Sequence, residues 1–456
     1  MKSINKMAVV AALALSSAGV ASATTYHVTG STAFRVADVS AEVAYCNANG
    51  GAYATYYGSS LTGANYSVVQ NAATSPSIKF ENYFNGSVAG DEALVDGVTQ
   101  IHFPNATDFA PTAVTTLPSS TTAAAGGTAK SAPTDNNLLT PYSTDTTFAD
   151  IAFSDVAFST AQQIIAASTD HTTATPTGDI QVGIVPFVFV ANGSSDVYSK
   201  LTGLSMDPQK FTYAWSSGAS TTLSFFTGVN ADEATTVYPM GRDVDSGTRA
   251  TALAETGYGL NGSGLITEGV GQYFPYDTTA HQTANSATTG VIGVDTTLVN
   301  PTIAGLNVVP AESIDGYTMP AGDGGYYSGG NLATGISTAF AGTVTNTVVM
   351  TYLGVSDAKS ALGATGTNRQ VAVLLSYDGS TFNPLSPNPV LIYEGQYTFW
   401  SYEHLFYKGS ATNLSTVASG LESWMNGTNQ LDKLSSGNVT LASMNVARTG
   451  DGQNIQ

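Results

Sequence analysis

The stretch that decides the fold runs from Tyr238 to Gly259 and reads YPMGRDVDSGTRATALAETGYG. Its apolar residues repeat at helical spacing between Ala250 and Ala254, and Gly257 is a stop signal. The pattern predicts a turn that opens directly into a helix. Ser246 is the expected N-cap, because its hydroxyl can accept a hydrogen bond from a free N–H group of the first turn.

The start of this predicted helix has the chemistry of an anion site. Free N–H groups and the helix dipole attract anions at a helix N-terminus. Gly247 has no Cβ, so a ligand can approach the backbone beside Thr248 closely. Arg242 adds a positive charge shortly before Ser246. The alternative is a capped surface helix with an incidental arginine, and this stretch alone leaves both interpretations open.

The beginning of the chain is typical of an exported protein. Residues 1–23 have the form of a signal peptide: Lys2 and Lys6 are basic, residues 7–20 are apolar, and residues 21–23 form an A-x-A cleavage site. No later apolar run is long enough to span a membrane. We therefore expect a soluble protein that is periplasmic or secreted. Its 456 residues suggest two or three domains.

Composition excludes several classes of function. Charged residues make up only 10% of the chain, and the formal net charge of −19 argues against nucleic acid as a partner. A small anion stays compatible with this charge, because local N–H groups can bind it. Cys46 is the only cysteine, which excludes an intramolecular disulfide and favours a small buried side chain.

The sequence gives no sign of an enzyme. The five histidines are scattered and have no metal-ligand spacing, so we expect neither a metal nor a cofactor. No G-x-S-x-G elbow accompanies Ser246, which argues against a serine hydrolase.

Two further small-residue turns precede predicted helices. Residues 24–30 alternate like a strand, and a helix follows from Ala33 to about Tyr45, with Ser31 or Thr32 as its expected N-cap.

The second of these turns follows a strand predicted from Ser77 onward. Residues 85–90 form the turn, and a helix is expected from Asp91 to about Asp96. Ser87 precedes the two acidic residues of that helix, so it is the better contact for an anion.

Asp155 follows a strand predicted at residues 150–153, and a helix is expected over residues 161–167. Ligand groups of α/β sheets usually lie at such strand ends. Residues 104–148, which precede this strand, are rich in Thr, Ser and Pro. This composition predicts a long, partly disordered surface insertion.

The remaining chain alternates strand and helix patterns. A nearly continuous apolar run at residues 182–190 predicts a buried strand, and the turn at residues 192–195 is an expected hinge. Further strands are expected at 348–353 and 371–377, a crossing at 396–400, helices at 402–408 and 414–425, and a loose tail at 451–456.

Alternating strands and helices with two chain crossings predict a two-lobed α/β binding protein. Small-residue motifs occur in order at residues 30–35 (GSTAFR), 86–90 (GSVAG), 154–155 (SD) and 241–249 (GRDVDSGTR), and TFWSYEH follows at 398–404. Together they resemble the phosphate-binding proteins of bacterial ABC transporters, especially a divergent branch with these longer forms. The resemblance is specific at the loops and does not extend over residues 104–148 or much of residues 280–345.

The resemblance implies a type 2 periplasmic binding-protein fold with a ligand cleft between two lobes. Residues 24–192 and 396–456 are expected to form the first lobe, which carries the insertion, and residues 193–395 the second. The implied function is capture of inorganic phosphate, or a similar tetrahedral oxyanion, for an ABC permease by a monomer. The matching ligand-binding residues are Thr32, Ala33, Ser87, Asp155, Arg242, Ser246, Gly247 and Thr248.

Asp155 is the informative member of this set. A carboxylate only accepts hydrogen bonds, so beside an oxyanion it requires a proton on the ligand. Hydrogen phosphate carries such a proton at neutral pH and sulfate does not. Asp155 is therefore expected to reject sulfate.

The sequence departs from the family pattern at two positions. Arg35 stands where an uncharged residue is usual, and Val244 stands where a carboxylate is common, although Asp243 and Asp245 flank it. We expect Arg35 and Arg249 to line the cleft mouth and speed association with the anion. The alternative is that both arginines pair with nearby carboxylates.

One rival function is also compatible with the sequence. The long insertion, the Thr- and Ser-rich composition and the lack of a lipid-anchor cysteine suit a structural or adhesive cell-surface protein. Such a protein would keep the binding-protein fold without a role in transport.

Overall fold

The computed structural model describes most of the chain after residue 23. The described residues are 24–56, 61–73, 77–95, 101–104, 112–114, 145–165, 174–216, 221–258, 269–276, 302–303, 305–309, 311–314, 317–326, 328–409, 411, 413–428, 430–434 and 437–456. The predicted signal peptide and most of the predicted insertion lie outside them. None of the described helices is both long and apolar enough to cross a membrane.

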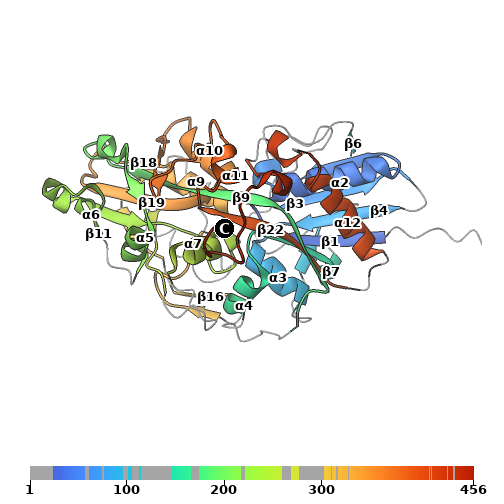
Figure 1. Cartoon of the computed structure of the whole chain (residues 1–456). Helices are drawn as coiled ribbons and strands as arrows, with labels where there is room; N and C mark the ends of the chain where they lie inside the picture. The colour runs from blue at the N-terminus through green and yellow to red at the C-terminus, as the bar shows by residue number, and fades with distance from the viewer. Residues whose placement is uncertain are drawn as a thin grey trace, which may run out of the picture.

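One mixed sheet forms the centre of the molecule (Figure 1). Its strands lie in the order β11 (Thr221–Thr222), β12 (Thr236–Pro239), β19 (Thr347–Gly354), β9 (Gly178–Gly193), β22 (Trp400–Tyr407), β8 (Ile151–Ser154), β1 (Thr24–Gly30), β4 (Ile78–Tyr83), β3 (Tyr66–Asn71), β2 (Ala52–Tyr56) and β6 (Thr112–Val114). β20 (Val373–Leu374) pairs with β9 beside this path.

The long strand β9 connects the two ends of this sheet. Its first part pairs with β22, where Trp400 lies opposite Pro186, and its second part pairs with β19, where Gly354 lies opposite Phe187. We call the strands from β22 to β6 the β1 side, and β19, β12 and β11 the β19 side. The buried strand predicted at residues 182–190 is confirmed as the core of β9, whose residues from Val182 onward are buried.

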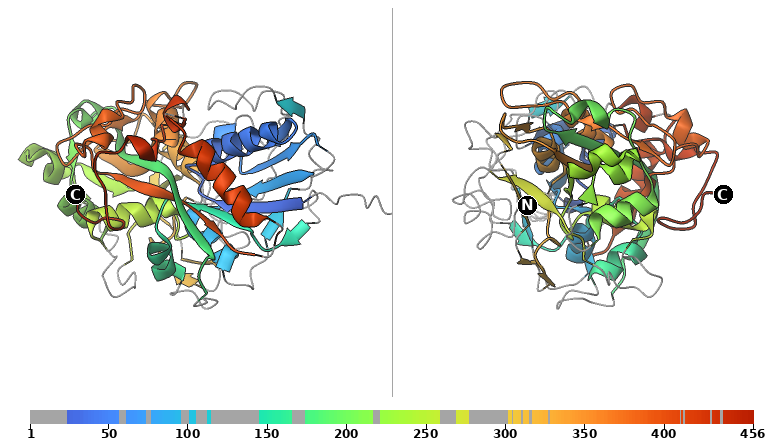
Figure 2. Two further views of the ribbon diagram at one scale, coloured as in Figure 1. Left: turned by 45° about the vertical axis from the view of Figure 1, so that its right-hand side comes forward. Right: turned by 90° about the vertical axis from the view of Figure 1, so that its left-hand side faces the viewer.

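Helices cover both faces of the sheet (Figures 1 and 2). One face carries α3 (Ser87–Val95), α4 (Phe158–Ile165), α5 (Pro208–Trp215) and α7 (Gly247–Thr256). The other carries α2 (Arg35–Ala48), α9 (Gly329–Ile336), α10 (Val355–Leu362) and α12 (Leu414–Met425). Two one-turn helices, α6 (Ser224–Thr227) and α11 (Val390–Tyr393), complete the described α-helices. The predicted α/β class is confirmed, and the core lies between the helices and the sheet.

Five two-stranded sheets are described in addition to the large sheet. They are β5 (Ile101–Phe103) with β7 (Asp145–Thr147), β10 (Ser205–Met206) with β21 (Ser376–Tyr377), β13 (Tyr273–Tyr276) with β15 (Gly305–Val308), β14 (Thr302–Ile303) with β18 (Ala339–Phe340), and β16 (Glu312–Ile314) with β17 (Tyr317–Met319). β6 and β7 are the described strands within the range predicted as an insertion.

The helix predicted at residues 402–408 is wrong, because residues 402–407 belong to β22 and Lys408 follows it. β22 lies between β8 and β9 and hydrogen-bonds to both. Its residues from Trp400 to Phe406 are buried, and aromatic residues suit a buried strand that has partners on both edges. The decisive partners are more than 200 residues away for β9, which no local pattern can reveal.

Two helix starts also differ from the prediction. The N-cap of α2 is Phe34 rather than Ser31 or Thr32, and it makes no side-chain capping bond. α3 begins at Ser87, four residues before the predicted start at Asp91. This start places the Ser87 hydroxyl on the first turn of the helix.

Candidate functional site

The start of α7 has the predicted form. The side chain of Ser246 accepts a hydrogen bond from the backbone N–H of Arg249 at 3.3 Å, and the helix ends at Gly257, whose φ of 69° suits glycine. Tyr238 and Pro239 end β12, so this helix start lies beyond the carboxyl end of a strand. The local signals around Ser246 therefore predicted the element correctly.

The start of α3 meets the start of α7. The backbone N–H groups of Val88 and Ala89 donate to the carbonyl oxygen of Asp245, at 3.0 and 3.4 Å. Asp245 directly precedes the Ser246 cap, so the N-terminal ends of two helices converge on one point. A Cβ on Gly86 would meet the same carbonyl, which explains the glycine at that position.

Asp155 lies at this convergence. The hydroxyl of Ser87 donates to its Oδ1, and the hydroxyl of Thr248 donates to its Oδ2 at 3.3 Å. The carboxyl group is buried, with 2% of the residue exposed. Burial raises the pKa of Asp155 above its ordinary value, while the hydrogen bond from Ser87 and the charge of Arg242 lower it.

Gly247 permits this close arrangement. A Cβ added at Gly247 would overlap Oδ1 of Asp155 and approach the side chain of Ser87. The sequence predicted that this glycine lets a ligand approach the backbone, whereas the group that approaches it in the structure is the Asp155 carboxylate. Ser87, Asp155, Gly247 and Thr248 therefore form one contiguous cluster.

Arg242 is buried beside this cluster, with 2% of the residue exposed. Its Nε donates to the carbonyl oxygen of Tyr326 at 2.9 Å, and its backbone N–H donates to the Tyr352 hydroxyl at 3.2 Å. These contacts hold the guanidinium in a defined position. Its charge acts on the Asp155 carboxyl, which places the arginine and the cluster within electrostatic reach of each other.

Thr32 and Ala33 lie at the same edge of the sheet. β1 and β8 are parallel neighbours, and Gly30 lies opposite Phe153. Thr32 comes two residues after Gly30, and Asp155 comes two residues after Phe153, so both lie beyond the carboxyl ends of neighbouring strands. Ala33 faces the β19 side, because a Cβ added at Gly354 would lie 3.5 Å from the Ala33 Cβ. The part that Thr32 and Ala33 play in the site stays a prediction.

The expectation that Arg35 and Arg249 line an exposed cleft mouth is wrong. They are only 2% and 1% exposed. Arg249 forms an ion pair with Asp323 at 2.7 Å, and Arg35 donates to the carbonyl oxygens of Thr32 and Ala64 at 2.7 and 2.8 Å. Both arginines donate hydrogen bonds to backbone carbonyl oxygens of nearby loops. A buried charge with fixed partners cannot act as an exposed steering charge.

Sequence patterns did not reveal every residue of the site. The Thr251 hydroxyl donates to the backbone carbonyl of Asp155 at 3.0 Å. Thr251 lies three residues after Thr248 on α7, so helical spacing could have placed both on one face. Tyr326 and Tyr352, which position Arg242, lie far from it in the sequence and carried no such signal.

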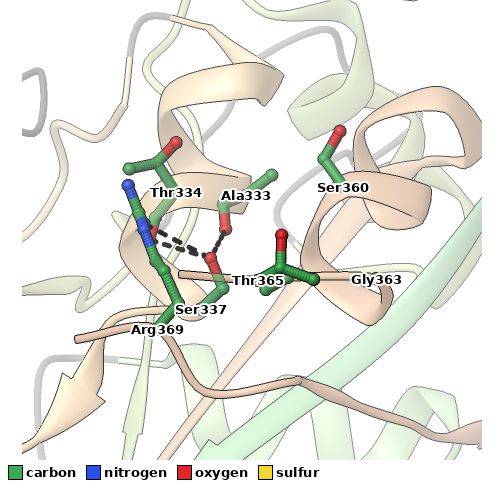
Figure 3. A pocket seen from close by; sticks show the side chains of 8 residues that line it. Ala333, Thr334, Ser337, Ser360, Gly363, Thr365 and Arg369 are labelled. Carbon is green, nitrogen blue, oxygen red and sulfur yellow. Dashed lines mark hydrogen bonds between the residues drawn. The ribbon is translucent and has the colours of Figure 1, made fainter. Parts of the chain in front are cut away.

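A separate pocket of about 210 Å³ lies near the C-terminal ends of α9 and α10 (Figure 3). Its lining includes Thr334, Ser337, Thr365 and Arg369, and none of the predicted site residues. Arg369 donates to the carbonyl oxygen of Thr334 at 2.7 Å, as a basic residue at a helix C-terminus often does. We therefore do not assign the predicted anion site to this pocket.

The molecule is thus an α/β protein with polar groups gathered where its strands and helices meet. The solved structures that it resembles in fold are those of phosphate-transport proteins. One is a candidate phosphate ABC transporter substrate-binding protein from Clostridium perfringens with bound phosphate, with 9% identity, coverage of 91% of this chain and 99% of the other, and a TM-score of 0.41. Another is PstS from Borrelia burgdorferi, with 10% identity, coverage of 91% and 98%, and a TM-score of 0.35.

A third similar structure is an ABC-type phosphate transport receptor from Vibrio cholerae. It has 10% identity, covers 64% of this chain and 80% of its own, and has a TM-score of 0.32. No protein-family model matches the sequence. No curated protein matches it either.

Proposed function

We propose that this protein is an extracytoplasmic binding protein for inorganic phosphate or a similar tetrahedral oxyanion, and that it serves ABC-type uptake as a monomer. The observation that carries the proposal is the convergence of the α3 and α7 N-terminal ends on the Ser87–Asp155–Thr248 cluster, beside the buried Arg242. The Val88 and Ala89 N–H groups of α3 donate to the Asp245 carbonyl oxygen, so the donors for a ligand would come from the α7 N-terminus, the rotatable hydroxyls and the guanidinium.

Asp155 supports phosphate over sulfate within this class. The carboxylate can only accept, so a neighbouring anion must present an O–H group to it. Hydrogen phosphate and hydrogen arsenate have this group at neutral pH, whereas sulfate leaves two acceptors facing each other. An unsatisfied buried acceptor costs about 1–3 kcal/mol, more when it is charged.

Titration calorimetry with phosphate, sulfate and arsenate tests the proposal. We expect phosphate and arsenate to bind, and sulfate to bind at least tenfold more weakly, a difference of about 1.4 kcal/mol. Equal affinity for phosphate and sulfate contradicts the assigned role of Asp155. Light scattering on the same sample checks the expected monomer.

One observation favours a second candidate function. The Asp155 carboxylate already packs against Gly247 and accepts the Ser87 and Thr248 hydroxyls, so the cluster also ties α7 to α3 and β8. In a structural or adhesive surface protein, this contact would only stabilise the fold. Absence of binding to all three oxyanions favours this candidate over the transport function.

A further inference from the structure

A second buried aspartate, Asp357, lies on the helix that follows β19. Asp357 lies on the first turn of α10 and is 6% exposed. This helix follows Gly354, the residue that approaches Ala33 on the β1 side. Asp357 therefore lies on the first turn of a helix that begins where the β19 side approaches Ala33 of the β1 side.

The Asp357 carboxylate lies against the start of a neighbouring helix. A Cβ added at Gly329, the first residue of α9, would overlap Oδ2 of Asp357, and one added at Gly330 would lie 3.9 Å from Oδ1. The N-cap Ser328 accepts from Asn331. In the described part of the chain, no hydrogen bond or ion pair links the Asp357 carboxylate to another side chain.

Among the described residues, charged groups on two other elements act electrostatically on Asp357. Arg35 of α2 and Arg242 of the loop after β12 both act on its carboxyl. Arg242 acts on Asp155 as well, so one guanidinium lies within electrostatic reach of a carboxyl from each side. Burial raises the pKa of Asp357 above its ordinary value, and the two arginines lower it.

We propose that Asp357 is a second proton-accepting carboxylate of the anion site, which determines the protonation state of the bound ligand. This inference rests on the proposed function. Asp155 accepts a proton of the ligand from the β1 side, and Asp357 shares a further proton with the ligand from the β19 side. The bound form is then dihydrogen phosphate, or monohydrogen phosphate beside a protonated Asp357.

The consequence is proton uptake on binding. At mildly alkaline pH, free phosphate is mainly the monohydrogen ion, which carries one proton and satisfies one carboxylate only. A second anion brought close to a buried carboxylate raises its pKa further. Binding should therefore take up about one proton per phosphate at this pH, and the apparent affinity should fall as the pH rises.

Calorimetry measures this uptake. Phosphate is titrated at mildly alkaline pH in two buffers of different ionisation enthalpy, and the difference in observed heat gives the number of protons. We expect about one proton for the unaltered protein and close to none for Asp357→Asn, whose amide can donate to the monohydrogen ion. Asp357→Asn should also bind sulfate more tightly, by roughly tenfold or more.

The matched control is Asp232→Asn, because Asp232 is a buried aspartate of the β19 side that pairs with Lys200 at 2.7 Å. It should keep the proton uptake and the selectivity of the unaltered protein. Circular dichroism and thermal melting show whether each variant folds. If Asp357→Asn does not fold, Asp357→Ser and the uptake by the unaltered protein decide the question.

The outcomes separate this inference from the proposed function. Phosphate binding without proton uptake in the unaltered protein overturns the role of Asp357 and leaves the proposed function intact. Uptake that Asp357→Asn retains in full also overturns it and assigns the proton to Asp155. Absence of phosphate binding by the unaltered protein overturns both.

Discussion

At the scale of single residues, Arg242 has the largest expected effect on anion binding. Arg242→Ala removes the buried guanidinium that acts on Asp155. Truncation of one partner of a desolvated charge pair costs about 2–4 kcal/mol, so phosphate affinity should fall roughly 30- to 900-fold. Titration calorimetry measures the loss.

A matched control distinguishes this effect from a general loss of positive charge. Arg369→Ala removes an arginine that lies in the separate pocket and contacts Thr334. It should leave phosphate affinity within about twofold of the unaltered protein. A similarly small effect of Arg242→Ala would show that the Arg242 guanidinium does not contact the bound anion.

Gly247 gives a prediction based on space alone. In Gly247→Ala the new Cβ overlaps the Asp155 carboxylate and approaches Ser87. Overpacking of this kind costs about 1–3 kcal/mol, so both phosphate affinity and the melting temperature should decrease. Gly342→Ala is the control, because its Cβ meets nothing within 4 Å. Equal behaviour of the two variants contradicts the observed packing.

Asp155 gives a prediction about selectivity. Asp155→Asn replaces an obligate acceptor with a group that can also donate, so sulfate should gain affinity relative to phosphate. Competition titrations with both anions measure the ratio. An unchanged ratio would point to Asp357 as the group that sets the selectivity.

At the scale of elements, the C-terminal strap (residues 445–456) replaces the loose tail predicted for residues 451–456. Oδ2 of Asp451 accepts from the backbone N–H of Ala157 and the hydroxyl of Thr160, at 2.8 and 2.7 Å, at the start of α4. Gly452 packs on the carbonyl oxygen of Ala254 near the end of α7. The strap therefore touches helices of both sides, and the C-terminus lies in the middle of Figure 1.

Arg448, near the N-terminal end of this strap, attaches it to α7 and β22. It forms an ion pair with Glu255 of α7 at 2.6 Å, and its guanidinium lies 4.4 Å from the centre of the Trp400 ring. The residues next to Arg448 in the sequence give no sign of these contacts, because Glu255 is 193 residues away.

Removal of the Asp451 carboxylate should weaken the attachment of α4. Asp451→Ala leaves the Ala157 N–H and the Thr160 hydroxyl without this acceptor, and loss of a helix-capping side chain costs about 0.5–2 kcal/mol. Urea denaturation measures the change in the free energy of unfolding. Gln453→Ala, two residues further along the strap, serves as control. A midpoint equal to that of the control would show that the strap is not stabilised through Asp451.

At the scale of the whole molecule, the β1 side buries several carboxyl groups. Asp38 and Glu42 of α2, Asp91 of α3 and Glu403 of β22 are each 0% exposed. Burial raises the pKa of each of the four well above its ordinary value. These groups hold protons in the folded protein at a pH where the unfolded chain has released them.

The stability of the protein should therefore decrease as the pH rises. A carboxyl group with a raised folded pKa contributes stability that is complete below its unfolded pKa of about 4 and is lost as the pH rises through its folded pKa. His27 acts in the same direction: although burial lowers its pKa, the contacts with Asp150 and Glu81 raise it to about 9. Its contribution is lost between about pH 6.5 and 9.

Urea denaturation at several pH values tests this slope. We expect the midpoint to fall from mildly acidic to alkaline pH, and Asp91→Asn to reduce the slope, because an amide at this position does not titrate. Ser154 donates to Oδ2 of Asp91 at 2.8 Å, and the amide oxygen can accept the same bond. A midpoint that rises over this pH range contradicts the prediction.

The sequence by itself determined the elements whose signals are local. α7 has its cap at Ser246 and its stop at Gly257, and α12 spans the predicted residues 414–425, because capping and helical periodicity act over a few neighbouring residues. The positions of Ser87 and Asp155 just beyond the ends of β4 and β8 followed from strand patterns in the same way. Local patterns were therefore sufficient to name Asp155 as a candidate site residue.

Only the tertiary structure decided what depends on distant partners. β22 is a strand because β8 and β9 hydrogen-bond to its edges, and Arg249 is a buried ion-pair partner because Asp323 reaches it from another loop. Asp357 lies within electrostatic reach of Arg242 because the sheet brings α10 to the same place. Hydrogen bonds and charges act through space over a few ångströms, and a linear pattern carries no information on which remote residues are brought within that range.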